Sequence, residues 1–234
     1  MIKISDVTKK YGDKKALDGV SFEVGDGEIF AFIGHNGAGK TTLIKAIVGI
    51  HDFDEGEVLI NDKSIKREPV ACKKEIAYVP DNPELYENMR AIQFINFICD
   101  MYEVEKERRE RNIKKYAEML EISANLNDTI DSFSHGMKQK VALIAALAHD
   151  PKILIMDEPF VGLDPKAVFS TKEVMREMVK SGKTIFFSTH ILDVAEKLCT
   201  KVAIIKKGKI MKVGSMKDVK GDKSLEKVFL ELEK

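Results

Sequence analysis

The sequence predicts an α/β fold with a mostly parallel sheet, and three observations support this prediction. The C-terminal part alternates continuous apolar strands, such as KILIM and TIFFS, with helical stretches, which is typical of a parallel sheet covered on both faces. The N-terminal part is rich in β-branched and aromatic residues and contains a hairpin pattern, which indicates an antiparallel β subdomain. The middle of the chain changes to a helical pattern. We therefore expect one domain over residues 1–234, with an inserted helical subdomain.

The bulk composition is that of an ordinary globular protein. Apolar residues make up 44% and charged residues 32% of the chain, and 38 Lys and Arg residues balance 38 Asp and Glu residues. This balance argues against a broadly basic surface, so we expect no nucleic-acid partner. No apolar stretch reaches the roughly 18–20 residues of a membrane helix, and MIKISDVTKK lacks the apolar core of a signal peptide. We expect a cytoplasmic protein in which Cys72, Cys99 and Cys199 are buried thiols.

The N-terminal strands are predicted from short segments of high β-propensity. β-Branched and aromatic residues in MIKISDV, SFEV and EIFAFI indicate three strands. A further segment, GEVLINDKSI, predicts a hairpin that turns at Asn61 and Asp62. Residues 1–83 therefore form the first part of the predicted core.

Residues 84–148 are predicted to form the helical subdomain, with a helical pattern from Leu85 to about Ile122. The pattern opens with a broad band of apolar side chains: Ile92, Phe94, Ile95, Phe97, Ile98 and Met101. The band is wider than one stripe facing a core requires, so two interpretations stay open: a helix packed on two sides, or a docking surface for a partner helix. Acids and bases alternate in the following run, EVEKERRERNIKKYAE, which indicates a solvated helix face.

Residues 149–234 are predicted to complete the core. The strand KILIM is followed by a helix that begins after Asp164 and Pro165. The strand TIFFS and a helix after His190 come next. The segment VAIIKKGKIMKVG predicts a final hairpin.

The segment GHNGAGKTT fits the phosphate-binding pattern GxxxxGK followed by Ser or Thr, and it lies between a predicted strand and a predicted helix. Glycines let consecutive backbone N–H groups turn toward a phosphate, and the helix start adds about half a positive charge. Lys40 is predicted to meet the terminal phosphates, and the Thr41 hydroxyl is predicted to bind Mg²⁺. The predicted nucleotide-binding residues here are Gly34, His35, Asn36, Gly37, Ala38, Gly39, Lys40, Thr41 and Thr42. The predicted fold is therefore a P-loop NTPase core that holds a nucleoside triphosphate.

Polar side chains follow two other predicted strands. KILIM ends at Asp157 and Glu158, and TIFFS ends close to His190. Because ligands gather beyond the carboxyl ends of the strands in open parallel sheets, we expect these residues to converge on the phosphate loop. Asp157 is predicted to hold Mg²⁺, and Glu158 to orient or deprotonate the attacking water. Glu158, His190 and Lys40 form the predicted catalytic set, although helix capping by the acidic pair and an ordinary early-helix role for His190 stay open.

The order of these motifs resembles that of the ATPase subunit of an ATP-binding-cassette (ABC) transporter over nearly the whole chain. The phosphate loop at 34–41 is followed by SHGMKQ at 134–139, KILIMDEP at 152–159, GLD at 162–164 and STH at 188–190. Many families share a bare phosphate loop, whereas very few share this order. The resemblance implies that the nucleotide is ATP and that Mg²⁺ accompanies it.

The resemblance also implies roles for the remaining predicted site residues. Tyr11, in KKYGDKKALDGVSFEV, resembles the aromatic residue that stacks on adenine, although packing on a turn stays open for it. Ser134 and Gly136 match the signature loop, which contacts the terminal phosphate of ATP on a second subunit. Asp164 lies in the GLD segment between subunits, and helix capping is a compatible second role for Ser134 and Asp164. Two chains, as a homodimer or a heterodimer, would enclose two ATP molecules.

The chain departs from the usual family pattern at two places. The signature, usually LSGGQ, reads FSHGM, so that His135 and Met137 are replacements; because the serine and the second glycine are retained, we expect the phosphate contact to be retained. Asp81 stands where the family usually has Gln, between the metal site and the membrane partner, so we expect Asp81 to be a metal ligand. These features look like the exporter-type subclass. In it, the ATPase subunit is peripheral on the inner face of the cell membrane, and the integral membrane permease is a separate chain.

Other functions stay open as alternatives. The strongest is a soluble ABC-type ATPase that acts on the ribosome or DNA, although the chain shows one cassette, no sustained heptads and no Cys clusters. A P-loop GTPase or small-molecule kinase would not explain FSHGM or GLDP, and an NKxD stretch for guanine is not found. A regulator that binds without hydrolysis is disfavoured because Glu158 is present. The motifs do not identify the transported substrate.

Overall fold

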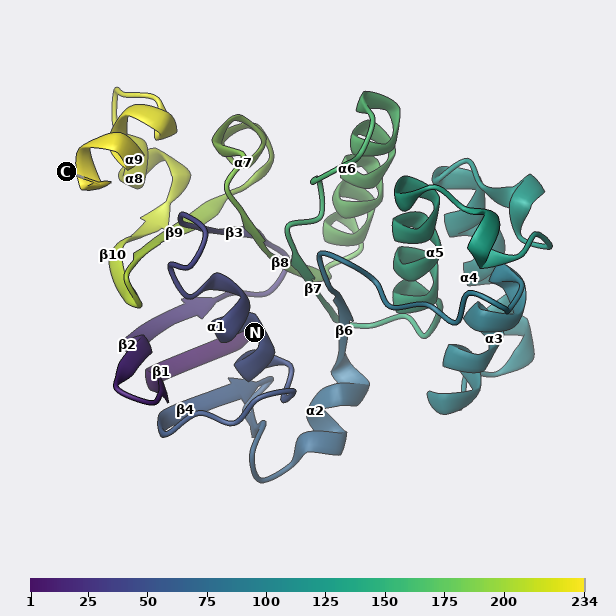
Figure 1. Cartoon of the computed structure of the whole chain (residues 1–234), viewed down its shortest axis with the longest axis horizontal. Helices are drawn as coiled ribbons and strands as arrows, with labels where there is room; N and C mark the ends of the chain where they lie inside the picture. Colours follow the sequence, from purple (N-terminus) through teal and green to yellow (C-terminus); the bar gives the residue numbers. More distant parts are fainter. Residues whose placement is uncertain (234) are drawn as a thin grey trace.

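The computed structural model of the protein describes residues 1–233, which fold into two sheets with helices around them (Figure 1). The first sheet is antiparallel and has the strand order β2-β1-β4-β5. Its strands are β1 (Ile2–Tyr11), β2 (Lys14–Val24), β4 (Glu55–Ile60) and β5 (Lys63–Ser64). The β4–β5 hairpin turns at Asn61 and Asp62, whose positive φ angles of 47° and 65° suit a tight primed turn. The predicted antiparallel subdomain and its hairpin are confirmed.

The second sheet is mostly parallel, as predicted. Within residues 1–233 it has the order β10-β9-β3-β8-β7-β6, and the β9–β10 pair is antiparallel. Its strands are β3 (Ile29–Ile33), β6 (Ile76–Val79), β7 (Ile153–Asp157), β8 (Thr184–Thr189), β9 (Lys201–Lys206) and β10 (Lys209–Ser215). All residues of β3, β7 and β8 are buried, which explains their continuous apolar sequences. The short edge strand β6 was not predicted from the sequence.

The central strand β3 contributes to two apolar cores. Its side chains alternate, so that Phe30 and Phe32 pack into the cluster shared with the antiparallel sheet, while Ala31 and Ile33 pack into the cluster shared with the helices. In the first cluster the Phe22 ring lies 5.3 Å from the Phe30 ring and 5.6 Å from the Phe32 ring, measured between centroids. The end of β3, where the phosphate loop begins, is therefore held from both faces.

Helices cover the parallel sheet (Figure 1). Those of the core are α1 (Lys40–Ile47), α2 (Pro69–Glu75), α6 (Pro165–Lys180), α7 (Leu192–Leu198), α8 (Met216–Lys220) and α9 (Leu225–Glu233). The helices expected after Pro165 and His190 are present as α6 and α7, and the expected final hairpin is β9–β10. The sequence did not predict α2, α8 or α9.

The middle of the chain forms a helical region at one end of the molecule, at the right of Figure 1. Its elements are α3 (Ala91–Met101), α4 (Lys106–Met119), α5 (His135–Ala148) and the 3₁₀ turns η1 (Ser123–Asn125) and η2 (Ile130–Ser132). The expectation of helix from Leu85 onward was wrong for residues 85–90. Part of this segment pairs with a distant one: Asp131 N–H donates to Glu87 O at 3.1 Å, Ile130 N–H donates to Met89 O at 3.0 Å, and Arg90 and Thr129 form an antiparallel bridge. Backbone groups of residues 87–90 are therefore engaged in pairing instead of in a helix.

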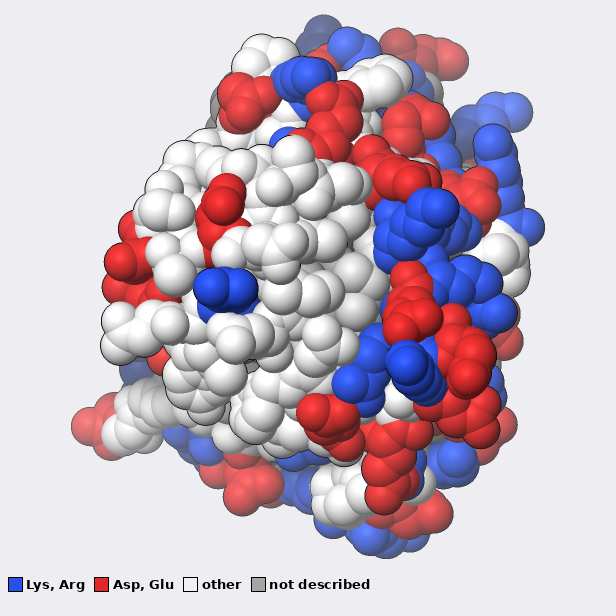
Figure 2. Space-filling model, turned by 90° about the vertical axis from the view of Figure 1, so that its right-hand side faces the viewer, with Lys and Arg blue, Asp and Glu red and all other residues white. Residues whose placement is uncertain are grey.

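The surface of the helical region is divided by charge. Figure 2 shows this end of the molecule, where a broad area with few charged residues adjoins a zone in which acidic and basic residues alternate. On α4, Ile113, Tyr116 and Ala117 are buried and most charged residues are exposed, which confirms the predicted solvated face. On and before α3, the side chains of Tyr86 (60%), Phe97 (38%) and Met101 (67%) are exposed although they are apolar or aromatic.

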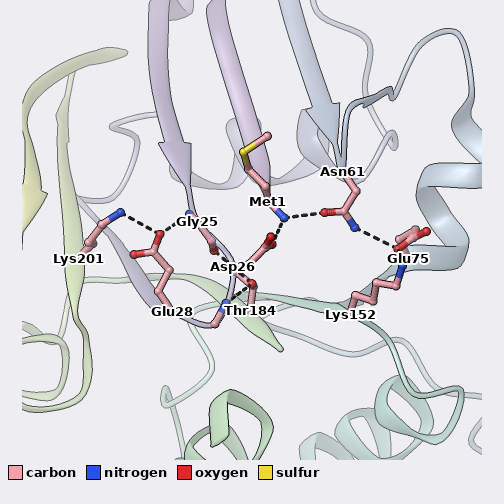
Figure 3. Close-up of polar contacts among 10 residues, drawn as sticks. Met1, Gly25, Asp26, Glu28, Asn61, Glu75, Lys152, Thr184 and Lys201 are labelled. Carbon is pink, nitrogen blue, oxygen red and sulfur yellow. Dashed lines mark hydrogen bonds and ion pairs between the residues drawn. The ribbon is translucent and has the colours of Figure 1, made fainter. Parts of the chain in front are cut away.

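A polar network joins the antiparallel sheet to the parallel sheet (Figure 3). Glu75, at the end of α2, accepts hydrogen bonds from Asn61 Nδ2 at 3.0 Å and from Lys63 Nζ at 3.3 Å. Lys152 Nζ, just before β7, lies 2.9 Å from the same carboxylate and, with the other two donors, lowers the pKa of Glu75. The turn of β4–β5 is thereby tied to the start of β7.

The three cysteines are buried, as predicted. Cys72, Cys99 and Cys199 are all buried and unpaired, and burial raises the pKa of each thiol. Among residues 1–233, a helix that combines the length and the apolar character needed to cross a bilayer is not found.

Candidate active site

The phosphate loop runs from the end of β3 to the start of α1, and two of its glycines are required by close packing. A Cβ atom at Gly34 would lie 2.7 Å from the Ile205 carbonyl oxygen. At Gly39, where φ is +114°, it would lie 2.6 Å from the Ala16 carbonyl oxygen. Gly39 is also the first residue before α1 and supplies no side-chain cap, so the first N–H groups of the helix are left to bind an anion.

Lys40 lies across this loop. Its side chain is 6% exposed, and Nζ donates to the Gly34 carbonyl oxygen at 2.7 Å and to the His35 carbonyl oxygen at 3.3 Å. Nζ also lies 3.1 Å from Glu158 Oε1 as an ion pair. Lys40 therefore links the phosphate loop to the end of β7, as the prediction of a shared site required.

Glu158 is held at the end of β7 by the neighbouring strand β8. Its φ angle is 47°, and its N–H donates to the Ser188 carbonyl oxygen at 3.2 Å and to Ser188 Oγ at 3.1 Å. The Ser188 hydroxyl in turn donates to Asp157 Oδ1. Ser188 thus contacts the Asp157 carboxylate and fixes the backbone from which the Glu158 side chain projects. The sequence predicted the STH motif but no site role for Ser188, because its contacts with Asp157 and Glu158 form only when β7 and β8 pair.

His190 contacts the same carboxylate from the other side. Its Nδ1 lies 3.0 Å from Glu158 Oε2, and its backbone N–H donates to that oxygen at 3.2 Å. Glu158 is therefore placed between Lys40 and His190, with its side chain only 14% exposed. The structure brings together the three residues predicted to be catalytic.

Asp157 has the properties of a cation ligand. The residue is 1% exposed, and Oδ2 is buried without a hydrogen-bond partner within residues 1–233. A buried carboxylate oxygen without a partner is unfavourable unless a cation or water meets it. Oxygen ligands are the kind that Mg²⁺ prefers, so the residues present fit that ion. Burial raises the pKa of the Tyr78 hydroxyl, and the negative charges of Asp157 and Asp81 raise it further.

The phosphate loop opens into a pocket of about 510 Å³. The predicted site residues that line it are Tyr11, His35, Asn36, Gly37, Gly39, Lys40, Thr41, Thr42, Asp81 and Glu158. Lys14 and Ala16 also line the pocket and were missed by the sequence reading. Their signal was their position just after Tyr11, at the start of β2, which returns past the phosphate loop.

Seven predicted residues do not line this pocket. Four of them belong to the phosphate loop or to the ends of β7 and β8 next to it: Gly34, Ala38, Asp157 and His190. The other three lie at the starts of α5 and α6: Ser134, Gly136 and Asp164. Ser134 Oγ accepts from Met137 N at 3.3 Å and caps α5, while Asp164 Oδ1 accepts from the first N–H groups of α6 at 2.8 and 2.9 Å. These backbone hydrogen bonds lower the pKa of Asp164. Both capping roles that the sequence left open are therefore present.

The signature loop and the GLD loop pack together in the same chain. A Cβ atom at Gly162, where φ is +73°, would lie 3.1 Å from His135 Cδ2, and one at Gly136 would lie 3.6 Å from Leu163 Cδ2. The replacement His135 is therefore accommodated against Gly162. Ser134 and Asp164 are exposed on this surface.

Comparison with known proteins assigns the family. The ABC transporter family model matches residues 17–161. An uncharacterized ABC transporter ATP-binding protein of Methanocaldococcus jannaschii is 38% identical over 93% of this chain and 79% of its own length. The structure of an ATP-binding subunit of an ABC transporter superposes with a TM-score of 0.95, at 33% identity and with complete coverage of both chains.

A second solved structure bears on the reaction. It is a dimeric, post-hydrolysis structure of an ATP-binding cassette bound to ADP and Pi, with a TM-score of 0.84 and 25% identity, covering 92% of this chain and 99% of that one. Its bound products are those of ATP hydrolysis. The chain therefore belongs to the ABC transporter family, in which it is an ATP-binding subunit that hydrolyses ATP.

Proposed function

We propose that this subunit energises transport of a substrate through a separate integral membrane permease, in the manner of an exporter, from the cytoplasmic face of the membrane. One observation carries this proposal. Asp81 lines the ATP pocket, and Pro83, Glu84 and Leu85 line a second, apolar pocket of about 300 Å³ against α3 and α5. The short segment from Asp81 to Leu85 therefore borders the site of hydrolysis at one end and, at the other, a groove suited to a short helix of a partner.

The groove has the character of a docking surface. Leu85, Phe94, Ile98 and Met101 contribute its apolar walls, and Tyr86 lies beside it with its ring centroid 6.1 Å from that of Phe94. Exposed apolar surface on an otherwise charged protein often marks an interface. Of the two interpretations of the α3 band, the docking surface is therefore the one we propose, while Ile95 serves the core.

For the chemistry, we propose that Glu158 orients the attacking water and receives its proton, with His190 fixing the carboxylate. Lys40 would exchange its contact with Glu158 for the terminal phosphates of ATP, which leaves Glu158 Oε1 free for water. Thr41, Asp157 and Asp81 would hold Mg²⁺, which neutralises phosphate charge when bound. Tyr11, 51% exposed at the end of β1, would stack on adenine.

We propose further that two subunits, identical or different, enclose two ATP molecules. Ser134, Gly136 and Asp164 would then meet the nucleotide held by the phosphate loop of the other chain. The exposure of Ser134 and Asp164, which do not line the ATP pocket, supports this arrangement. In this proposal residues 84–148 form a helical subdomain inserted into the core formed by residues 1–83 and 149–234.

A soluble ATPase that acts on ribosomes or DNA is the alternative, and crosslinking distinguishes the two. A photoreactive amino acid at Tyr86, introduced in the source cell, is expected to crosslink to an integral membrane protein recovered in the membrane fraction. The same amino acid at Val70, which is 68% exposed on α2, is the control and should not give that product. Crosslinks from Tyr86 to ribosomal proteins or DNA would contradict transport and favour the alternative.

A further inference from the structure

We propose that Phe229 in the C-terminal helix α9 is a positioning residue for ATP binding, which acts by holding His35 of the phosphate loop. The Phe229 and His35 rings meet edge to face, with centroids 4.8 Å apart and an interplanar angle of 63°. Phe229 is 6% exposed, so its ring is packed within the protein. The contact joins two segments almost two hundred residues apart in the sequence.

Helix α9 is itself anchored, so Phe229 is a fixed support. At its start, the Leu225 N–H donates to Glu196 Oε2 of α7 at 2.8 Å. Near its end, Lys206 Nζ of β9 donates to the Leu232 carbonyl oxygen at 2.9 Å. Leu225 and Val228 are buried in the core shared with the parallel sheet. The helix therefore lies against the sheet next to the phosphate loop.

The position of His35 matters because its backbone shapes the anion site. The His35 carbonyl oxygen accepts from Ala38 N at 3.1 Å, which closes the turn of the loop, and from Lys40 Nζ at 3.3 Å. A shift of His35 therefore displaces both the turn and the lysine. Because Phe229 touches the loop and not the reacting atoms, its removal should weaken ATP binding more than it slows hydrolysis of bound ATP.

The test is steady-state ATP hydrolysis by the full isolated subunit, which needs no permease and is independent of the transport proposal. Phe229→Leu keeps apolar volume but removes the ring, and it is expected to raise KM for ATP about 3–10-fold with kcat within about twofold of wild type. Phe229→Tyr, which retains the ring, should have a KM close to that of the wild type. Leu230→Ala is the matched control on α9, since Leu230 is 55% exposed.

A double-mutant cycle separates positioning from a general loss of packing. His35→Ala should raise KM by a similar factor, and combining it with Phe229→Leu should add little, because both remove the same contact. The proposal would be overturned if the fold-increases in KM of the two single variants multiplied in the double variant. It would also be overturned if Phe229→Leu had the same KM as Leu230→Ala. Equal KM values for Phe229→Tyr and Phe229→Leu would also overturn it. If Phe229→Leu does not fold, the cycle is run with Phe229→Tyr as the reference and Phe229→Met as the variant without a ring.

Discussion

At the scale of the residue, Glu158 has a backbone conformation that few residues other than glycine adopt. Its φ of 47° is maintained by two hydrogen bonds from its N–H to Ser188. Conformations of this kind persist where the surrounding structure enforces them, and they cluster at functional sites. Here the conformation directs the carboxylate between Lys40 and His190.

This placement predicts a specific defect for Glu158→Gln. The amide retains the shape of the carboxylate but cannot take a proton from water, so we expect kcat to fall by about 10²–10⁴-fold while ATP still binds. Hydrolysis rates, nucleotide binding and size-exclusion chromatography measure these effects, and the variant should accumulate as an ATP-bound dimer. Lys40→Ala is the contrasting variant, which should fail already at nucleotide binding. Near-normal hydrolysis by Glu158→Gln would remove Glu158 from this role.

His149 predicts a dependence of stability on pH. Burial, together with the positive charges of Lys183 and Arg108, lowers the pKa of its imidazole to about 4, and the Tyr102 ring stacks on it with the two centroids 3.8 Å apart. Because the unfolded chain protonates near pH 6.5, the free energy of unfolding falls as the pH decreases from about 6.5 to 4, by up to about 3 kcal/mol.

Urea unfolding of the wild type and of His149→Gln at pH 7.5 and at pH 5 measures this contribution. Carboxylates contribute to both proteins, so the difference between their pH dependences isolates His149. We expect the variant to lose less stability on acidification than the wild type. Parallel pH dependences in the two proteins would contradict the assignment.

At the scale of the element, the parts of the fold that could be predicted are those specified by local pattern. The fully buried strands β3, β7 and β8 and the glycine-rich loop before Lys40 carry their signals within a few residues. The start of α3 could not be predicted, because residues 87–92 pair with residues 126–131, which are distant in the sequence. For the same reason the contacts of Ser188 with the Asp157 carboxylate and the Glu158 N–H, and that of Phe229 with His35, arise only in the folded chain.

The groove along α3 predicts that docking and hydrolysis can be separated. Tyr86 is 60% exposed and Leu85 is half-buried in the core, so Tyr86→Glu should leave folding and basal ATP hydrolysis largely intact. It should weaken co-purification with the membrane partner or abolish transport, since a charge would be buried at the interface. Val70→Glu is the matched exposed control. If Tyr86→Glu loses basal hydrolysis and thermal stability together, these residues belong to the core.

At the scale of the whole molecule, the residues predicted to bind ATP lie in two separate places. The phosphate loop, Glu158 and Asp81 share one pocket, whereas Ser134 and Asp164 are exposed elsewhere and do not line it. The caps of α5 and α6 therefore do not line the pocket of their own phosphate loop. This separation is the reason for our proposal that they meet the nucleotide of a second subunit.

This division predicts that two inactive variants complement each other. Ser134→Asp retains an oxygen to cap α5 but places a negative charge against the terminal phosphate, and Lys40→Ala removes the phosphate ligand. Each variant alone should be nearly inactive. Mixing them creates heterodimers in which the phosphate loop of the Ser134→Asp chain faces the intact signature loop of the Lys40→Ala chain. With random pairing and independent sites, about a quarter of wild-type hydrolysis should return. A mixture no more active than its parents, although heterodimers are detected by differential tagging, would show that the sites are not shared or that both must act together.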